Sequence, residues 1–347
     1  MDALYAKSMG GNAPIENLEF GDRPAPEPGA AEVRVRMQAA TLNHHDLWTL
    51  KGVVGYPITL PRILGCDGVG IVDAYGSERP PESPDPRSEV ILYPLRFCGH
   101  CAGCQGGDPM LCRRFQMLSD GTSEGSFAQY VVLPAVHVIP KPPELSAAEA
   151  AALCVTFLTA YRMLFVKARL QPGQSVLVNA AAGGVGSAAV AMGAAAGLRV
   201  FASSRSQAKL EFARSLGASD VVLAGRDAVK AVLRATGGEG VDAVIETVGE
   251  ATWGTSLRAV RQGGTIVVAG ATSGPNPPAD LPRIFWRQLT ISGSTMGSLP
   301  EFRDMLRFVV TRRIMPVIDS TFALRDGRRA FERLAADEHM GKITLTV

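Results

Sequence analysis

The sequence has no run of about 18 apolar residues, the length that a helix needs to cross a membrane, so we expect no membrane span. Residues 1–20 lack the basic start and the continuous apolar segment of a secretory signal. No large excess of charge is present either, because 35 Lys and Arg against 33 Asp and Glu give a net charge of +2. These absences argue against a membrane protein, a secreted protein and a nucleic-acid-binding protein.

Cysteine is scarce and unevenly placed, which bears on both redox state and metal binding. Four of the six cysteines fall between positions 98 and 112. A dense cluster of this kind is more typical of a metal site in a reducing compartment than of disulfide pairs. We therefore expect a cytoplasmic protein that binds a metal ion. The 347 residues are long for one hydrophobic core and predict two domains.

The chain is organised around a strand, a glycine-rich turn, a helix and a second strand between residues 174 and 209. Strands are predicted at 175–178 and 198–202, with an Ala- and Met-rich helix between them. The glycines before this helix (Gly183, Gly184 and Gly186) leave room for a pyrophosphate, and the helix N-terminus attracts its charge. The pattern predicts a dinucleotide-binding turn. Ala180 stands where the first glycine is usual, and the alternative is a tight turn that binds no ligand.

The most specific motif is Cys98-Gly-His-Cys101-Ala-Gly-Cys104, followed by Cys112. Four thiolates at these spacings can surround Zn²⁺ tetrahedrally, and the intervening glycines let the backbone turn tightly around the ion. A closed shell of four sulfur ligands leaves no position for water or substrate, so this zinc is expected to be structural. A [4Fe–4S] cluster, which also takes four cysteines, is the alternative.

The first half of the chain is predicted to form an irregular, β-rich domain that carries two groups of polar residues. Short strands separated by Pro and Gly are predicted at 32–40, 68–74, 90–93 and 127–133. The polar groups are Asn43-His44-His45-Asp46 and Cys66-Asp67. Such side chains could bind a metal or move protons. The alternative is a polar helix start whose histidines are hydrogen-bonded at the surface.

The second half alternates strands and helices after the glycine turn. Strands are predicted at 220–223, 241–246, 265–269, 289–292 and 341–347, and helices at 206–216, 227–236, 300–312 and 326–336. This alternation predicts the α/β class, with a doubly wound parallel sheet that binds its ligand at the carboxyl ends of the strands. Residues 144–164 are predicted to form a helix, with Ser146 as N-cap and Glu149 as its partner.

Along nearly its whole length the chain resembles the medium-chain dehydrogenase/reductase superfamily, which includes zinc-containing alcohol dehydrogenases and quinone oxidoreductases. The resemblance rests on Leu64-Gly-Cys-Asp-Gly-Val-Gly70, the four cysteines, Thr159-Ala-Tyr161, Ala180-x-x-Gly-Gly-Val-Gly186 and Gly341-Lys-Ile343. It implies a GroES-like catalytic domain at 1–155 and 294–347, with a zinc lobe at about 96–115, and a Rossmann domain at 156–293. It also implies hydride transfer between a nicotinamide cofactor and a small-molecule carbonyl substrate.

The sequence departs from the family where its alcohol dehydrogenases bind a catalytic zinc. Their first Cys is Asn43 here, their His-Glu pair is Cys66-Asp67, and their last Cys is Val155. The Asn43-x-x-Asp46 pattern instead resembles the quinone oxidoreductase and enoyl reductase branch, which usually lacks the four-cysteine lobe. We therefore expect an NADPH-dependent reductase of enones or quinones without a catalytic zinc. Its catalytic candidates are Asn43, His45, Asp46, Cys66 and Asp67.

Three functions stay open. In the reductase, His45 is the candidate proton donor, because it falls where alcohol dehydrogenases of the family keep a proton-relay hydroxyl; a structural histidine is the alternative. A zinc-dependent alcohol dehydrogenase with altered ligands would use Cys66, Asp67 and Cys154. A protein that binds NADPH without turning over a substrate is the third possibility.

The end of the second strand favours NADPH over NADH. NAD-binding turns place an acidic residue there to bind the ribose hydroxyl, whereas this chain has Ser203-Ser204-Arg205 and then Lys209. The two cations would bind a 2′-phosphate through charge-assisted hydrogen bonds. A tyrosine found near the third strand in quinone reductases is absent, and Leu223-Ala224 lies there. The expected cofactor-binding residues are Thr159, Gly183, Gly184, Val185, Gly186, Ser203, Ser204, Arg205, Lys209, Val248, Gly270 and Ala271.

The last predicted strand of the parallel sheet, within residues 289–294, would leave an apolar edge without a partner strand. Members of the resembled family commonly dimerise by joining these edges, so we expect a homodimer. The alternative is an edge covered by the Pro-rich segment 275–282.

Overall fold

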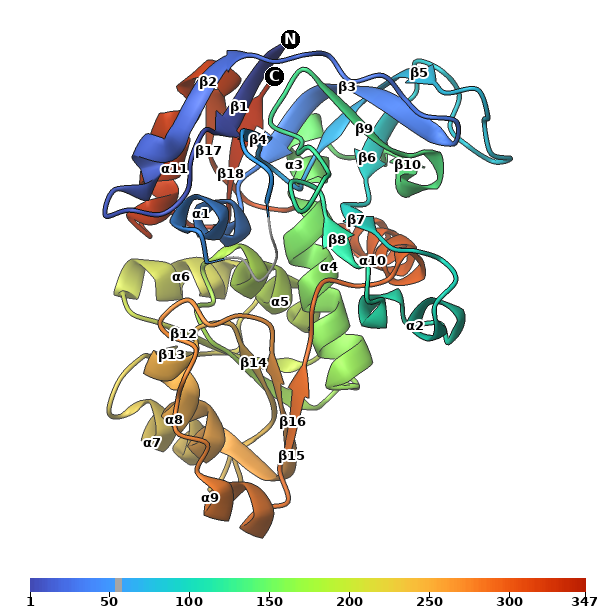
Figure 1. Ribbon diagram of the computed structural model, residues 1–347. Helices are drawn as coiled ribbons and strands as arrows, with labels where there is room; N and C mark the ends of the chain where they lie inside the picture. Colours follow the sequence, from blue (N-terminus) through green and yellow to red (C-terminus); the bar gives the residue numbers. More distant parts are fainter. Residues whose placement is uncertain (54–57) are drawn as a thin grey trace. The chain divides into compact units, whose positions relative to one another are not determined.

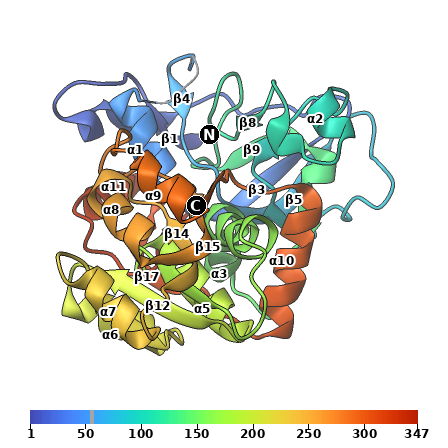
Figure 2. The same cartoon turned by 90° about the horizontal axis from the view of Figure 1, so that it is seen from below.

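The computed structural model describes residues 1–53 and 58–347 (Figure 1). Its internal contacts divide the chain into two compact units. Unit 1 consists of Met1–Val155, Ser298–Leu306 and Met315–Val347, and unit 2 of Thr156–Gly297 and Arg307–Ile314. Both ends of the chain belong to unit 1 and lie near each other in Figures 1 and 2.

Unit 1 is built mainly from antiparallel strands. Its larger sheet has the order β10-β6-β5-β3-β18-β17, with β9 also paired to β3, and a smaller sheet has the order β2-β1-β4. β17 and β18 run parallel, whereas the other pairs described in the larger sheet are antiparallel. The strands are β1 (Asp2–Ala6), β2 (Leu18–Asp22), β3 (Glu32–Thr41), β4 (Arg62–Ile63), β5 (Val69–Tyr75), β6 (Glu89–Leu92), β7 (Leu95–Arg96), β8 (Gln116–Met117), β9 (Tyr130–Pro134), β10 (Val138–Pro140), β17 (Ile318–Ala323) and β18 (Lys342–Thr346).

Short helices complete unit 1, and two of them close its core. Helices α1 and α11 contact each other, and their apolar residues share one buried cluster with strand and loop residues. Within it, the rings of Phe127 and Phe331 meet edge to face at 6.2 Å, a favourable aromatic geometry. The helices are η1 (Pro14–Asn17), α1 (His44–Lys51), α2 (Ala102–Gln105), η2 (Pro109–Leu111), η3 (Ala135–His137), α3 (Ala147–Ala151), η6 (Leu324–Asp326) and α11 (Gly327–Ala335).

Unit 2 contains a six-stranded parallel sheet with the order β13-β12-β11-β14-β15-β16. Helices α5 and α6 pack on β11, β12 and β13, while α7 and α8 contact each other and β13, β14 and β15. Figure 2 shows α6 and α7 at the same edge of this sheet. The elements are α4 (Leu158–Tyr161), η5 (Arg162–Lys167), β11 (Ser175–Val178), α5 (Gly184–Ala195), β12 (Arg199–Ser204), α6 (Gln207–Ser215), β13 (Asp220–Leu223), α7 (Ala228–Ala235), β14 (Val241–Glu246), α8 (Glu250–Ala259), β15 (Val260–Val268), α9 (Leu281–Trp286) and β16 (Thr290–Gly293).

This architecture confirms the predicted fold class, a β-rich GroES-like domain together with a doubly wound parallel sheet. Two expectations about individual elements were wrong. The helix predicted at 144–164 is divided into α3, the π-helical η4 (Leu153–Phe157), α4 and the π-helical η5. β15 begins at Val260, five residues before the predicted start at 265, because Val260 already pairs with Val241. Helix α10 (Leu299–Thr311) has residues in both units. In the described chain, no helix is long and apolar enough to cross a membrane.

Candidate active site

The first group of predicted catalytic residues lies where β3 ends and α1 begins. Asn43 is the N-cap of α1, and its backbone N–H donates to Asp46 Oδ2 at 2.8 Å. The other oxygen of Asp46 accepts the backbone N–H of Gly65 at 3.0 Å, so the carboxylate ties the start of α1 to the turn before Cys66. Burial raises the pKa of Asp46 to about 6, against the opposing effect of His45. This geometry indicates a structural role for Asp46 as the cap of a buried helix start.

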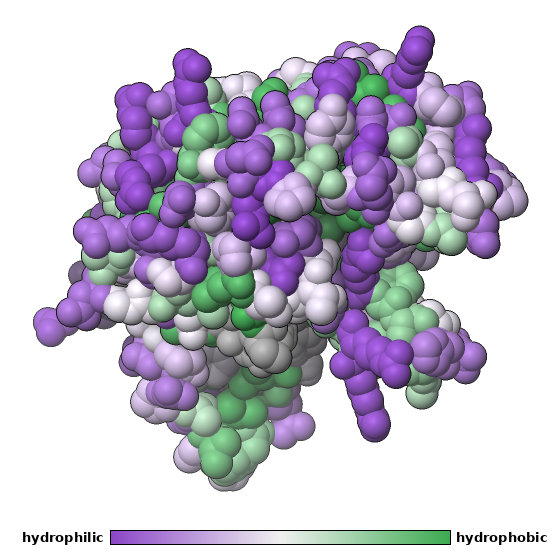
Figure 3. All heavy atoms as spheres, turned by 45° about the horizontal axis from the view of Figure 1, so that its top comes forward, coloured by the Kyte–Doolittle hydropathy of each residue, from purple (hydrophilic) through white to green (hydrophobic). Residues whose placement is uncertain are grey.

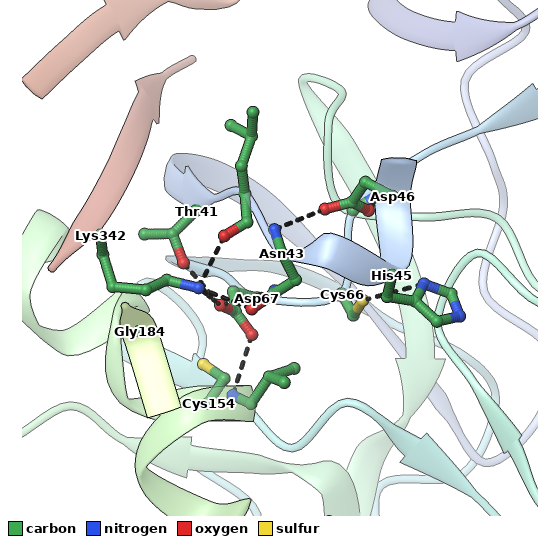
Figure 4. A network of polar contacts seen from close by, with 12 residues as sticks. Thr41, Asn43, His45, Asp46, Cys66, Asp67, Cys154, Gly184 and Lys342 are labelled. Atoms are coloured by element: carbon green, nitrogen blue, oxygen red, sulfur yellow. Dashed lines mark hydrogen bonds and ion pairs between the residues drawn. The ribbon is translucent and has the colours of Figure 1, made fainter. Parts of the chain in front are cut away.

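Asp67 is the centre of a buried polar network (Figure 4). Its Oδ2 accepts hydrogen bonds from Thr41 Oγ1 at 2.5 Å and Asn43 Nδ2 at 2.9 Å, and lies 3.1 Å from Lys342 Nζ. Its Oδ1 accepts the backbone N–H of Val155 at 2.9 Å. The Asp67 side chain is fully buried and that of Lys342 is 4% exposed. A buried carboxylate with this many donors has its charge compensated and its lone pairs engaged.

Lys342 is engaged as completely as Asp67. Its Nζ also donates to the backbone oxygen of Leu42 at 2.7 Å and to Asn43 Oδ1 at 2.6 Å. An ammonium group has three donor hydrogens, and these contacts use all of them. The Asn43 amide is likewise used at both ends, because it accepts from Lys342 and donates to Asp67. The network thus joins the end of β3, the residue after Cys66 and the start of β18.

His45 forms a second group with a buried carboxylate and a buried thiol. Its Nε2 lies 3.0 Å from Asp120 Oδ1, although the two atoms are not aligned for a hydrogen bond. Its Nδ1 lies 3.7 Å from Cys66 Sγ. Asp120 and Cys66 are fully buried, whereas the His45 side chain is 11% exposed, more than the other predicted catalytic residues. His45 is therefore the most solvent-accessible of the predicted catalytic residues.

The charges around His45 favour its protonated form. Burial opposes protonation, but the Asp120 carboxylate, with smaller contributions from Asp46 and Asp67, raises the pKa of His45 above its usual value. Burial and the same carboxylates raise the pKa of the Cys66 thiol well above its usual value. Cys66 is therefore held as a neutral thiol beside a histidine that favours its charged form.

The ligand set of the alternative zinc site is not assembled. Asp67 is occupied by the network, and Cys154 Sγ lies 3.7 Å from the backbone oxygen of Gly68. Among the described residues, the group that brings potential ligand atoms within 4.8 Å of one another here is instead His45, Asp46 and Cys66. Both oxygens of Asp46 already accept backbone N–H groups.

The four clustered cysteines form a set suited to a metal ion. Their sulfur atoms lie within 4.8 Å of one another, at 3.6 Å for Cys101–Cys104 and Cys98–Cys112 and 3.9 Å for Cys98–Cys104. Tetrahedral zinc with Zn–S bonds of about 2.3 Å requires sulfur separations of about 3.8 Å. Backbone N–H groups of Cys98 and Arg114 donate to Cys112 Sγ, which suits a thiolate. The residues therefore fit a zinc ion with four sulfur ligands.

The glycine turn in unit 2 leads directly into α5. Gly183 is the N-cap of α5 and carries no side chain that could cap the helix, so the first N–H groups are available to an anion. A Cβ on Gly186 would lie 2.2 Å from the backbone oxygen of Ala180, which requires glycine there. Ala180 itself has φ of 50°, the left-handed conformation that glycine adopts more easily. The turn is thus shaped as predicted, with Ala180 strained where glycine is usual.

The other predicted cofactor residues lie at the carboxyl ends of the unit 2 strands or on α4. Ser203 and Ser204 end β12 and are buried, while Arg205 follows them and is exposed. Val248 lies in the loop after β14, and its backbone oxygen accepts the N–H of Ser273 from the loop after β15, which also contains Gly270 and Ala271. Thr159 is buried in α4, and its hydroxyl donates to Met296 Sδ at 3.6 Å. Gly184 and Val185 open α5, and Lys209 lies in the first turn of α6.

A pocket of about 480 Å³ also opens at these strand ends. It is lined by Asn179, Ser203, Ala224, Gly225, Arg226, Ala228, Val229, Lys230, Ala251, Thr252, Thr255 and Arg258. Glu246, which is fully buried, accepts hydrogen bonds from Asn179 Nδ2 at 2.9 Å and Thr252 Oγ1 at 2.8 Å and so fixes two of the lining side chains. No sequence motif marks the three cations of this pocket (Arg226, Lys230 and Arg258), because they lie outside the glycine turn.

Lys342 and Asp120 were also missed. Gly341-Lys-Ile343 is a point of family resemblance, but Asp67, the partner of Lys342, is 275 residues away in the sequence. Asp120 lies in an irregular segment with no motif that would link it to His45. The one available signal was Lys342 itself, the one charged residue of the predicted strand 341–347, since a buried lysine needs a counter-charge.

Comparisons with known proteins agree with the fold. Residues 29–143 match the family described as alcohol dehydrogenase GroES-like domain, and residues 184–311 match zinc-binding dehydrogenase. A zinc-type alcohol dehydrogenase-like protein of Schizosaccharomyces pombe is 32% identical over 91% of this chain and 91% of its own. A crotonyl-CoA carboxylase/reductase of Cereibacter sphaeroides is 30% identical over 90% of this chain and 80% of its own. A crystal structure of an NAD-dependent alcohol dehydrogenase superposes with a TM-score of 0.94 at 41% identity, covering 100% of both chains.

Proposed function

The chain belongs to the medium-chain dehydrogenase/reductase superfamily, and from this premise we propose that it is an NADPH-dependent oxidoreductase that delivers hydride to an enone or quinone without a catalytic zinc ion. The observation that carries the proposal is the occupation of Asp67 by Lys342 and three other donors. Asn43 and Val155, which replace thiolate ligands in the family resemblance, supply amide groups to the same carboxylate. One relative is named a crotonyl-CoA carboxylase/reductase, and crotonyl-CoA is a conjugated thioester. This name supports a conjugated carbonyl compound as the class of substrate.

The residues around His45 suit the chemistry of conjugate reduction. Bound NADPH would supply the hydride, and addition at the β-carbon of an enone leaves negative charge on the carbonyl oxygen. His45 would stabilise this oxygen and give it a proton from Nδ1, while the Asp120 carboxylate, 3.0 Å from Nε2, favours the protonated ring. Sulfur is a weak acceptor, so a substrate oxygen would compete successfully with Cys66 for the Nδ1 proton. Removal of such a donor typically costs about 3 kcal/mol in the barrier.

The choice of cofactor is supported by the residues at the end of β12. Ser203-Ser204-Arg205 contains no carboxylate that would repel a 2′-phosphate. The NAD-dependent relative favours the opposite choice, so both cofactors belong in any assay. The geometry of the four cysteines supports one structural zinc ion per chain, bound by Cys98, Cys101, Cys104 and Cys112.

Two other functions compete with this one. A zinc-dependent alcohol dehydrogenase is favoured by the names of several relatives and by the proximity of His45, Asp46 and Cys66. That group is weakened as a metal site because both oxygens of Asp46 accept backbone N–H groups. A protein that binds NADPH without catalysis retains the cofactor turn but needs none of the charge arrangement at His45.

The experiment that tests the proposal is a steady-state survey of the purified protein with NADPH and NADH. Enones, quinones and aldehydes are offered as acceptors, and primary and secondary alcohols as donors with the oxidised cofactors. We expect NADPH-dependent reduction of an enone or quinone to exceed alcohol oxidation in kcat/KM. Faster alcohol oxidation would favour the second function. Absence of turnover throughout the panel, with NADPH still bound, would favour the third.

We also propose that unit 2 pairs with a second copy of itself through β16. This strand is the edge of the sheet, and Ile291 within it is exposed, so the alternative of a covered edge is not favoured. The neighbouring helix α9 exposes Leu281, Phe285 and Trp286. Figure 3 shows apolar side chains gathered at the lower end of the view, the end where Figure 1 places α9. An apolar patch beside an open strand edge is the surface that a symmetric strand-to-strand dimer would bury.

A further inference from the structure

The cysteines of the chain differ in how far they can be reached from the surrounding water. Cys66 and Cys154 are fully buried. Among the four clustered cysteines, Cys112 is 6% exposed and the other three are partly exposed. Because oxidation of cysteine follows exposure, an oxidant in the surrounding water reaches the cluster before it reaches the two buried thiols.

The sulfur atoms of the cluster form two complementary pairs. Cys101 Sγ lies 3.6 Å from Cys104 Sγ, and Cys98 Sγ lies 3.6 Å from Cys112 Sγ. The contact that joins the two pairs, from Cys98 Sγ to Cys104 Sγ, is longer at 3.9 Å. A disulfide has an S–S length of about 2.05 Å, so each pair would close by an approach of about 1.5 Å. This pairing uses all four sulfur atoms.

The backbone of the segment leaves room for this approach. Gly99 and Gly107 adopt left-handed conformations, and nothing lies within 4 Å of a Cβ added to either of them. Strands β7 and β8 pair with each other and close the segment at its base. The cysteines can therefore move within a loop whose two ends stay joined, and the change is confined to that loop.

We infer that the four-cysteine segment is an oxidation-sensitive site, in which hydrogen peroxide replaces the zinc ion by the disulfides Cys101–Cys104 and Cys98–Cys112. The inference rests on the structural zinc of the proposed function and adds to it a chemical response. In each pair, one sulfur attacks a peroxide oxygen, the O–O bond breaks and hydroxide leaves. The second sulfur then displaces the remaining hydroxide and forms the S–S bond.

The step balances without a further reactant. The two sulfurs of a pair lose two electrons, and one peroxide molecule takes them up. Two peroxide molecules therefore give two disulfides, four hydroxide ions and one free Zn²⁺. The ion leaves because the sulfurs of a disulfide no longer carry the negative charge of the thiolates that bind it.

Peroxide together with a chromophoric zinc chelator tests the release of the ion. Zinc content is measured first, and the zinc freed from the full-length protein is then read from the absorbance of the chelator. We expect peroxide in moderate excess to release the ion completely and faster than the chelator alone, and thiol reductant with added zinc to restore it. Cys154→Ser is the matched control, because it removes a buried thiol outside the cluster and should release zinc in the same way. Thermal melting verifies that the variant is folded.

Mass spectrometry of the segment identifies the product. Cleavage by trypsin at Arg96 and Arg113 releases residues 97–113, which contain all four clustered cysteines. After free thiols are blocked in denaturant, we expect this peptide to carry no blocking group and to be lighter by four hydrogen atoms, with fragmentation assigning the two disulfides. Oxidation of Met110 to the sulfoxide adds an oxygen, which fragmentation also locates. The two buried cysteines should remain reduced and react with the blocking reagent.

Four results would overturn the inference: zinc that stays bound under peroxide, sulfinic or sulfonic acids in place of disulfides, disulfides between other pairs, or earlier oxidation of Cys66 or Cys154. Protein purified without zinc would refute the proposed ion instead, and the mass of residues 97–113 would then still decide whether the two disulfides form. Since the experiment uses neither cofactor nor carbonyl substrate, a failure of enone reduction leaves its result standing.

Discussion

At the scale of single residues, the buried ammonium group of Lys342 engages the Asp67 carboxylate and so keeps it from binding a metal ion. Lys342 compensates the Asp67 charge and at the same time orients the Asn43 amide. Burying both charges costs solvation energy that is recovered only when the partners stay together. The pair therefore holds the end of β3 and the start of β18 in one arrangement.

Lys342→Met should expose the cost of leaving Asp67 without its counter-charge. The length of the side chain is kept, but a buried carboxylate loses its cation, and we expect the free energy of unfolding to fall by about 3 kcal/mol. Urea denaturation measures it. Lys230→Met is the control, because its side chain is 80% exposed and its ion pair contributes at most about 1 kcal/mol. Equal stability of Lys342→Met and wild type would contradict this account of the network.

The titration of His45 tests the role of Asp120. Because the pKa of His45 is raised in the folded protein, the stabilisation from its protonated form is present below the usual pKa of about 6.5 and is lost as pH rises through the folded value. Asp120→Asn removes the charge at nearly constant shape and should lower the pKa of His45. It should also move the alkaline limb of enone reduction to lower pH.

Nuclear magnetic resonance of the histidine rings measures this pKa directly, with His45→Gln used for assignment. The pH dependence of the free energy of unfolding is a poor measure of His45 alone. The pKa of Asp46 is also raised, to about 6, so the fold is additionally destabilised as pH rises toward that value. A wild-type His45 that titrates at or below about 6.5 would show that burial outweighs Asp120.

At the scale of elements, the four-cysteine segment would depend on the proposed zinc ion for its shape. Residues 98–112 contain the short helices α2 and η2, so metal binding would supply much of the folding free energy of the segment. We expect Cys104→Ser to lose the zinc and to make residues 96–115 sensitive to protease. Elemental analysis of purified protein measures the loss. Cys154→Ser, outside the cluster, should keep one zinc per chain, and zinc retained by Cys104→Ser would refute the site.

The sequence predicted elements well where local patterns decide them. The strands at 220–223 and 241–246 have the predicted bounds, since each is a short apolar run followed by turn residues. The helix predicted at 144–164 has the predicted cap, with Ser146 and Glu149 bonded to each other, but two π-helical segments interrupt it. No Gly or Pro marks those segments, because π-turns depend on packing rather than on residue type.

The candidate site, too, depends on packing that local sequence patterns do not reveal. Asn43, Asp46 and Asp67 were named from the sequence as catalytic candidates, and in the structure all three belong to hydrogen-bond networks. Those roles follow from partners distant in sequence. Lys342 could not be paired with Asp67 without the sheet that brings β18 beside β3.

At the scale of the whole molecule, the exposed edge of the parallel sheet predicts assembly. Trp286→Asp places a charge in the apolar patch formed by α9 and β16, and we expect it to convert a dimer into a monomer. Light scattering after size-exclusion chromatography gives the mass. Leu223→Asp is the control, because Leu223 is exposed on β13, the opposite edge of the same sheet. A monomeric wild type at micromolar concentration would refute the proposed dimer.

The central claim is that hydride transfer to a conjugated carbonyl proceeds without a catalytic metal, with Asp67 bound by Lys342 rather than by an ion. Metal content and activity measured on one preparation test it most directly. The account predicts one zinc per chain, held by the four cysteines, and NADPH-dependent reduction of enones or quinones that persists after brief treatment with chelator. Two zinc ions per chain, together with chelator-sensitive oxidation of alcohols faster than enone reduction, would contradict it.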